Sequence, residues 1–196
     1  MEASTELITA DGVVLAARLD GPPTPAVTVV WCHPHPLYGG SMFAPLMNGV
    51  TDALSDRGIG VLRFNFRGGP DSGGVHGGGV DEVADVAAAV ELAERRSPRV
   101  IVAGWSFGGA MALAHVAGDD KDYLAVAPYL PLAPHPEQMT SRTGVIVAAS
   151  RDQVVDHDGV ADYAQHAHAR FVTIDSDHFF VSKATQVADA FSPLLA

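Results

Sequence analysis

Residues 99–117 read RVIVAGWSFGGAMALAHVA. Residues 100–103 are apolar and mostly β-branched, as in a buried strand, and residues 110–117 are mainly apolar and rich in alanine, as in a buried helix. The pattern G-x-S-x-G from Gly104 to Gly108 lies between them and predicts a sharp turn from strand to helix. We expect these glycines to lie so close together that a β-carbon on either would clash. Ser106 is then strained, with its hydroxyl above the sheet and its backbone at a helix N-terminus.

The segments on both sides of this turn alternate between strand and helix patterns. Apolar runs predict strands at residues 26–32, 60–66, 99–103, 123–127, 143–149 and 170–174. Helical spacing of apolar residues predicts helices at residues 43–55, 81–96, 160–169 and 183–195. This alternation predicts the α/β class, with a three-layer α/β/α, doubly wound and mostly parallel sheet. Two short runs flank Asp11 and Gly12, a strong hairpin signal, and are expected to add an antiparallel edge at the N-terminus.

The composition indicates a globular protein. Of the 196 residues, 47% are hydrophobic and 18% charged, and we find no internal repeat or linker, so we expect a single domain over residues 1–196. The formal charge of −11 argues against nucleic-acid binding and against attachment to anionic membranes. The first residues lack the features of a signal peptide, and no apolar run approaches membrane-spanning length. Cys32 is the only cysteine, which excludes internal disulfides, and a reducing, cytoplasmic location is expected.

A serine hydroxyl needs a general base, and a group that orients the base, before it can act as a nucleophile. In an open parallel sheet, such groups gather beyond the carboxyl ends of the strands. Asp152 follows the predicted strand at residues 143–149, and His178 follows the one at residues 170–174. We therefore predict a catalytic set made of Ser106, Asp152 and His178.

Other acids and histidines are weaker candidates for these roles. Asp175 and Asp177 are too close in sequence to His178 to end a separate strand. Asp156 and Asp158 are better placed to cap the helix that follows them. Three further histidines lie on or near that helix and are expected to be solvated: His157, His166 and His168.

Four blocks carry a resemblance over nearly the whole chain: residues 33–40 (HPHPLYGG), 65–68 (NFRG), 104–108 (GWSFG) and 177–180 (DHFF). They resemble the α/β-hydrolase superfamily, and in particular its small, lidless, dienelactone-hydrolase-like serine hydrolases. The order serine, aspartate, histidine is also typical of that superfamily. The resemblance implies an α/β-hydrolase fold without a cap domain. Two places depart from the family pattern: Ala149 replaces a glycine before Asp152, and the loop after Arg67 lacks the usual Gly-Val-Gly-x-Ser sequence.

Hydrolases of this kind stabilise the developing oxyanion with two backbone N–H groups. The first is expected from Phe107, which follows the nucleophile. The second is expected from the loop after the strand at residues 26–32, where both prolines of the HPHP sequence are excluded because proline has no N–H. If the first His-Pro pair takes the place of the family's His-Gly, the donor is His35. A shift of two residues makes it Leu37.

The connection expected to carry a lid in larger hydrolases is short here. Only residues 128–142 separate two predicted strands, and this segment is rich in proline, so a loop fits there and a lid domain does not. The site is therefore expected to be shallow and open and to suit a small or flexible acyl group. Its expected lining is apolar or aromatic: Leu37, Tyr38, Trp105, Phe107, Tyr129 and Phe179.

The remaining features favour structural explanations. His33 and His35 could form half of a metal site, but no third ligand has a recognisable spacing. Cys32 ends a buried strand and is expected in the core rather than as a nucleophile. Arg67 could bind a substrate carboxylate, although a role in holding its loop is favoured. The glycine-rich segment 68–79 lacks the endings of a phosphate-binding loop.

The expected function is hydrolysis of a small-molecule carboxylic ester or thioester through an acyl-enzyme, without a metal or other cofactor. Lactone hydrolysis, C–C bond hydrolysis and peptidase activity with the same residues stay open as alternatives. A non-catalytic binding protein of the same fold is the alternative from another class. We expect neither nucleic acid nor a membrane as a partner.

Overall fold

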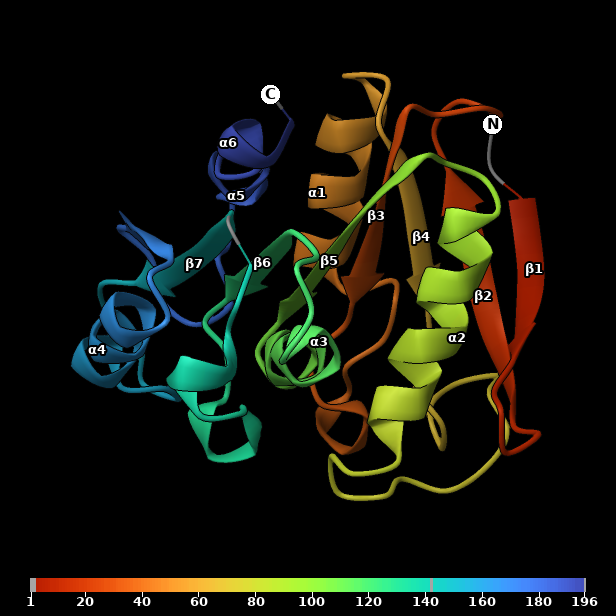
Figure 1. Cartoon of the computed structure of the whole chain (residues 1–196), viewed down its shortest axis with the longest axis horizontal. Coiled ribbons are helices and arrows are strands. Elements are labelled where there is room, and N and C mark those ends of the chain that lie inside the picture. Colours follow the sequence, from red (N-terminus) through yellow and green to blue (C-terminus); the bar gives the residue numbers. More distant parts are fainter. Residues whose placement is uncertain (1–2, 142, 196) are drawn as a thin grey trace.

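The computed structural model describes residues 3–141 and 143–195, and its centre is one eight-stranded sheet (Figure 1). The strands are β1 (Ala3–Ile8), β2 (Val14–Asp20), β3 (Val27–Cys32), β4 (Gly60–Phe64), β5 (Arg99–Trp105), β6 (Tyr123–Val126), β7 (Gly144–Ala149) and β8 (Arg170–Ile174). Their order is β1-β2-β4-β3-β5-β6-β7-β8, and the pairs from β4 to β8 are parallel. Strand β2 lies antiparallel to both β1 and β4. The predicted mostly parallel sheet with an antiparallel N-terminal edge is confirmed.

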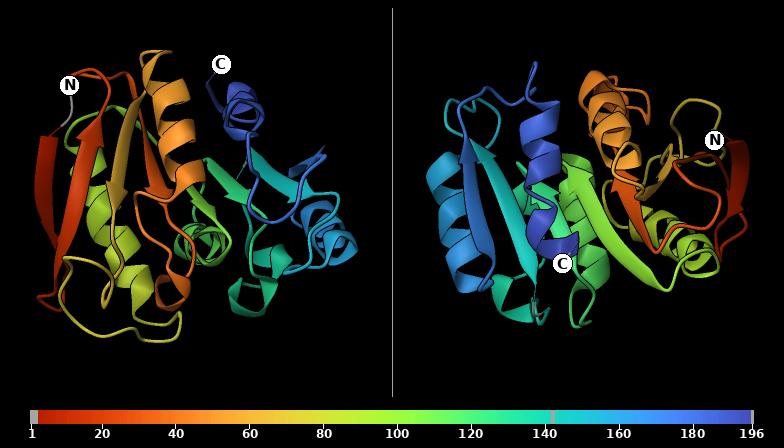
Figure 2. Two further views of the ribbon diagram at one scale, coloured as in Figure 1. Left: turned by 180° about the vertical axis from the view of Figure 1, so that it is seen from behind. Right: turned by 90° about the horizontal axis from the view of Figure 1, so that it is seen from above.

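Helices cover both faces of this sheet. They are α1 (Pro45–Ser55), α2 (Glu82–Glu94), α3 (Phe107–Val116), α4 (His157–His166), α5 (Ala184–Asp189) and α6 (Ser192–Leu195). Helices α2, α3 and α4 lie on one face, and α1 packs against α5 on the other (Figure 1 and Figure 2). Every residue of β4, β6 and β7 is buried, as expected of parallel strands covered on both sides.

The prediction of one continuous helix at residues 183–195 is wrong. The chain forms α5, then leaves the helix at Ala190 and Phe191, and resumes as α6. Pro193 explains the break, because it has no N–H to bond the carbonyl four residues earlier but fits in the first turn of a new helix.

Helix α4 begins earlier than predicted, because the carboxylate of Asp156 accepts the N–H of Gly159 at 3.0 Å and caps it. The predicted capping role of Asp156 is therefore confirmed, while Asp158 lies inside the first turn.

The chain between β6 and β7 forms two single-turn 3₁₀ helices, Leu130–Leu132 and Pro136–Gln138, and no lid within its described residues. The carboxyl end of the sheet is thus left open on this side. No helix in residues 3–141 or 143–195 is long and apolar enough to cross a membrane.

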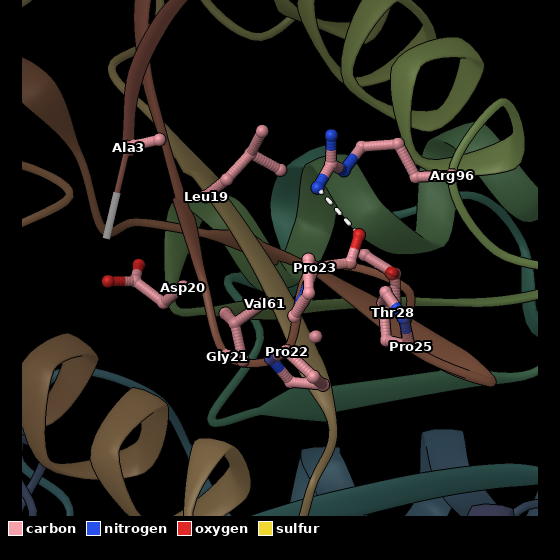
Figure 3. A pocket seen from close by; sticks show the side chains of 11 residues that line it. Ala3, Leu19, Asp20, Gly21, Pro22, Pro23, Pro25, Thr28, Val61 and Arg96 are labelled. Atoms are coloured by element: carbon pink, nitrogen blue, oxygen red, sulfur yellow. Dashed lines mark hydrogen bonds between the residues drawn. The ribbon is translucent and has the colours of Figure 1, made fainter. Parts of the chain in front are cut away.

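A small hollow of about 60 Å³ lies at the opposite end of the sheet, where β3 and β4 begin (Figure 3). It is bordered by the proline-rich turn after β2 and by Arg96, whose guanidinium donates to the carbonyl of Pro23 at 3.2 Å. Ligands of open α/β sheets bind at the carboxyl ends of the strands, so this hollow lies on the wrong side for catalysis.

Candidate active site

The turn between β5 and α3 places Ser106 where the sequence predicts it. Ser106 has φ 57° and ψ −116°, a strained combination for a residue other than glycine, and it forms the N-cap of α3. A β-carbon on Gly104 would overlap the carbonyl oxygen of Gly108, as expected. A β-carbon on Gly108 would instead overlap the carbonyl oxygens of Cys32 and His33. The second glycine therefore lets α3 approach the end of β3, a requirement that the local pattern does not reveal.

Gly108→Ala is expected to lower the free energy of unfolding by about 3 kcal/mol or more, because backbone carbonyls cannot move aside as a flexible side chain can. Gly118→Ala is the matched control: it has φ +77° and open space around its β-carbon, so about 1 to 2 kcal/mol of backbone strain is expected. Urea denaturation of both variants measures the difference. Equal losses would contradict the close approach of α3 to β3.

Three loops at the carboxyl ends of β5, β7 and β8 bring the predicted set together. Nε2 of His178 lies 3.0 Å from Oγ of Ser106, and its Nδ1 lies 2.8 Å from Oδ2 of Asp152. All three side chains are almost completely buried. This geometry allows the histidine to take the serine proton while the carboxylate fixes its ring.

Asp152 is held by more than the histidine. Its Oδ1 accepts the N–H groups of Val154 and Val155 at 2.8 and 2.9 Å. Burial acts to raise the pKa of Asp152, but the hydrogen bond from His178 and the two backbone N–H groups outweigh it and hold the pKa below its usual value. The carboxylate is therefore ionised at neutral pH.

The weaker acid and histidine candidates have other contacts. Asp177 accepts the N–H of Phe179 at 3.0 Å, and Asp175 pairs with Arg151 at 3.0 Å on the surface. His166 binds the carbonyl of Asp162 within its own helix.

Trp105 positions the histidine loop, a role that the sequence did not suggest. Its Nε1 donates to the carbonyl oxygen of His178 at 3.1 Å, and its ring lies 6.0 Å from the imidazole. The residue before the nucleophile thus ties β5 to the loop that carries the base.

The two predicted oxyanion donors lie on adjacent segments. The rings of His35 and Phe107 are 4.9 Å apart, and neither backbone N–H has a hydrogen-bond acceptor within the described residues. The N–H of Leu37, the alternative donor, points to Nδ1 of His35 at 3.3 Å. His35 is therefore the better placed of the two, because its N–H is still available.

His33 shapes the loop that carries His35. It is fully buried, its Nε2 accepts the N–H of Phe66 at 3.0 Å, and its Nδ1 donates to the carbonyl of Pro34 at 2.5 Å. Burial lowers the pKa of His33 to about 4, so the ring is neutral at physiological pH. Both nitrogens are occupied, and no group of three metal-binding side chains occurs in the part of the chain that the structure describes.

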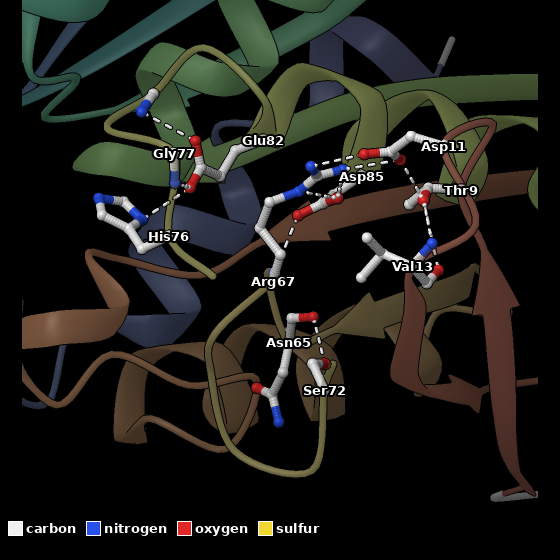
Figure 4. A network of polar contacts seen from close by, with 11 residues as sticks. Thr9, Asp11, Val13, Asn65, Arg67, Ser72, His76, Gly77, Glu82 and Asp85 are labelled. Atoms are coloured by element: carbon white, nitrogen blue, oxygen red, sulfur yellow. Dashed lines mark hydrogen bonds and ion pairs between the residues drawn. The ribbon is translucent and has the colours of Figure 1, made fainter. Parts of the chain in front are cut away.

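The glycine-rich loop after β4 is held by two clusters of polar contacts, one around Arg67 and one around Glu82 (Figure 4). Arg67 pairs with Asp85 at 2.8 Å and with Asp11 at 2.9 Å, and its bonds lower the pKa of Asp11 to about 2. Glu82 accepts the N–H groups of Gly77 and Gly79 at 2.7 and 2.8 Å. The guanidinium of Arg67 is thus fully engaged, which confirms its expected structural role.

A cleft of about 510 Å³ opens above Ser106. Among the predicted lining residues, Tyr38, Trp105 and Phe179 border it, whereas Leu37 and Tyr129 do not. The Phe107 ring is buried beneath the surface and packs on Phe66. The other residues that border the cleft are Pro34, His35, Gly39, Gly40, Ala44, Pro45, Ser106, Val154 and His178.

Comparisons with known proteins show which family this chain resembles. A sequence model of the dienelactone hydrolase family matches residues 75–184. An uncharacterized protein of Rickettsia prowazekii is 31% identical over 91% of this chain and 82% of its own length. A lidless α/β serine hydrolase from Xanthomonas campestris is 27% identical and superposes with a TM-score of 0.87, over 98% of this chain and 92% of its own.

A second solved structure, an α/β serine hydrolase homologue from Coxiella burnetii, is 26% identical, with a TM-score of 0.83 over 99% of this chain and 97% of its own. The family match covers the segment from the glycine-rich loop to α5 and so includes the loops of Ser106, Asp152 and His178. The chain is therefore a hydrolase of the α/β fold that belongs to the dienelactone hydrolase family.

Proposed function

We propose that this protein is a serine hydrolase that cleaves a carboxylic ester or thioester through an acyl-enzyme intermediate. The observation that carries the proposal is the position of His178, which bridges Oγ of Ser106 at 3.0 Å and Oδ2 of Asp152 at 2.8 Å. The family match and the serine hydrolase relatives support the same reaction class.

The mechanism follows from the tautomer that these bonds impose. The ionised carboxylate of Asp152 can only accept a hydrogen bond, so Nδ1 of His178 carries the proton. Nε2 then presents its lone pair to Ser106. Oγ of Ser106 attacks the carbonyl carbon as its proton passes to Nε2. The resulting imidazolium, stabilised by Asp152, protonates the leaving group. Water then attacks the acyl-enzyme, with the same histidine as base, and releases the acid.

The oxyanion formed in both steps needs donors that have no other partner. The N–H groups of Phe107 and His35 meet this condition. Phe107 is the first residue of α3, so the partial positive charge of the helix N-terminus adds to the stabilisation.

A fluorophosphonate probe tests the proposal directly. The wild-type protein is expected to be labelled on Ser106 and to hydrolyse p-nitrophenyl acetate. Absence of labelling, or labelling that survives Ser106→Ala, would show that Ser106 is not the nucleophile. A panel of p-nitrophenyl esters, neutral thioesters, lactones and peptides then separates ester hydrolysis from its alternatives.

The second oxyanion donor can be tested by a pair of variants. His35 has φ −54°, within the range of proline, so His35→Pro removes the N–H at a residue whose own φ need not change. His35→Ala removes the same imidazole and keeps the N–H. The proline variant is expected to have a kcat about 100- to 1000-fold below that of the alanine variant, with a smaller effect on KM. Equal kcat values would assign the role to Leu37, which the same pair of substitutions at residue 37 then checks.

A further inference from the structure

Two apolar hollows meet beside Ser106. The cleft above Ser106 lies beside a flanking pocket of about 400 Å³. Pro45, Trp105 and Phe179 border both spaces. The residues that border only the flanking pocket are Leu46, Phe180, Val181, Ser182 and Ala184. The two spaces therefore lie next to each other, with Phe179 at their common border.

The segment that forms this pocket has an unusual backbone. Phe180 and Ser182 have φ angles of 51° and 59°, in the left-handed region that residues other than glycine rarely adopt. Phe180 is turned into the core, whereas Phe179 and Val181 remain 61% and 69% exposed. Strained backbone that keeps large apolar side chains in solvent is typical of functional sites, because folding alone would favour their burial.

Cationic side chains do not contribute to either space. Among the described residues, no lysine or arginine borders the cleft or the flanking pocket. Lys183 follows Ser182 in the sequence, but it does not border the pocket either. Arg67 is engaged by two aspartates, and Arg151 pairs with Asp175.

The titratable groups around the cleft also disfavour an anion. Asp152 lies directly behind His178, and Glu82 lies 2.7 Å from His76, whose ring centroid is 4.7 Å from that of His35. Burial and the neighbouring His76 lower the pKa of His35, the histidine of the cleft outside the catalytic set, so it offers no positive charge at neutral pH. An anionic substrate would therefore lose its hydration and gain no counter-charge.

We propose that the preferred substrate is an uncharged ester with an apolar arm that extends past Phe179 into the flanking pocket. This inference rests on the proposed function. It predicts that esters with a carboxylate or a phosphate group are poor substrates, and that coenzyme A thioesters, which carry phosphates, are poor substrates too.

Charge selectivity can be tested with two substrates that differ only in one methyl group. Mono-p-nitrophenyl adipate carries a carboxylate, and its methyl ester is neutral. The neutral compound is expected to have a kcat/KM at least about tenfold higher. Val154→Lys, which adds a cation to the cleft, is expected to shrink this ratio about fivefold or more. Val75→Lys is the matched control on an exposed loop outside the cleft, and it should leave the ratio unchanged.

The flanking pocket can be tested with esters of different chain length. The ratio of kcat/KM for p-nitrophenyl octanoate to that for the acetate is expected to exceed about ten, because added methylenes become buried. Val181→Asp places a carboxylate in the pocket and should lower this ratio about tenfold, whereas Val80→Asp on the exposed loop should not.

The outcomes separate this inference from the proposed function. If wild-type protein hydrolyses the acetate but either ratio is close to one, the inference is overturned and the serine hydrolase stands. If the Val181 and Val154 variants behave as their controls do, the inference is also overturned. If no ester is hydrolysed, both fall.

Discussion

Replacing Ser106 by alanine is expected to lower kcat for a neutral p-nitrophenyl ester by about 10⁴- to 10⁶-fold. The hydroxyl lies 3.0 Å from Nε2 of His178, and its loss removes the acyl-enzyme route. A residual rate above the uncatalysed reaction is expected, because the N–H groups of Phe107 and His35 remain in place. The measurement is kcat under saturating ester, corrected for spontaneous hydrolysis.

His178→Ala should cause a loss of similar size, and the double variant should be no slower than either single one, because the residues act as a unit. His166→Ala is the control: this histidine lies on the surface of α4 and should leave kcat within about twofold of wild type. Circular dichroism should show all of these variants folded. A double variant much slower than either single variant would mean that Ser106 and His178 act independently.

The arrangement around Ser106 could be predicted because its causes are local. Where G-x-S-x-G lies between a strand and an apolar helix, the backbone can adopt few turn conformations. Residues that follow other parallel strands lie at the same edge of the sheet, because the carboxyl ends of these strands meet there. Asp152 and His178 were found by this argument alone. Their contacts of 2.8 and 3.0 Å show that the three side chains meet at this edge of the sheet.

Other parts of the site depend on how segments that are distant in the sequence pack together. No local sequence pattern predicts that packing. Val154 and Pro45 border the cleft although nothing in their neighbourhood marks them, because their positions depend on how two loops meet across the sheet edge. Leu37 and Tyr129 were expected there for their size and apolar character. Leu37 lies within the single-turn helix Pro36–Tyr38 and Tyr129 caps the one at Leu130–Leu132, and neither borders the cleft.

The exposure of Phe179 and Val181 could not be predicted from the sequence either, and its cause is the backbone conformation. The sequence after His178 is a run of apolar residues that would normally predict burial on one face. Two left-handed residues in that run turn alternate side chains outward, and no local pattern announces this conformation. The break before α6, in contrast, has a local cause that the sequence shows, because Pro193 cannot continue the preceding helix.

Asp152→Asn is expected to lower kcat by about 10⁴-fold while the protein remains folded. The carboxylate Oδ1 accepts two backbone N–H groups, from Val154 and Val155, and an asparagine must turn its carbonyl oxygen toward them. Its NH₂ group then faces Nδ1 of His178, which becomes an acceptor. The proton of the ring moves to Nε2, and the nitrogen opposite Ser106 can no longer take a proton from the serine.

Proton NMR and a second aspartate variant separate this explanation from simple loss of charge. Wild type is expected to show a downfield resonance from the hydrogen-bonded Nδ1–H of His178, and Asp152→Asn should lack it. Asp156→Asn removes one charge nearby, where Asp156 only caps α4, and should keep both the resonance and most of the activity. Because its hydrogen bonds hold the pKa of Asp152 below the usual value, the wild-type resonance should persist well into mildly acidic solution. An Asn variant that keeps the resonance but loses activity would mean that Asp152 acts through its charge and not through the tautomer.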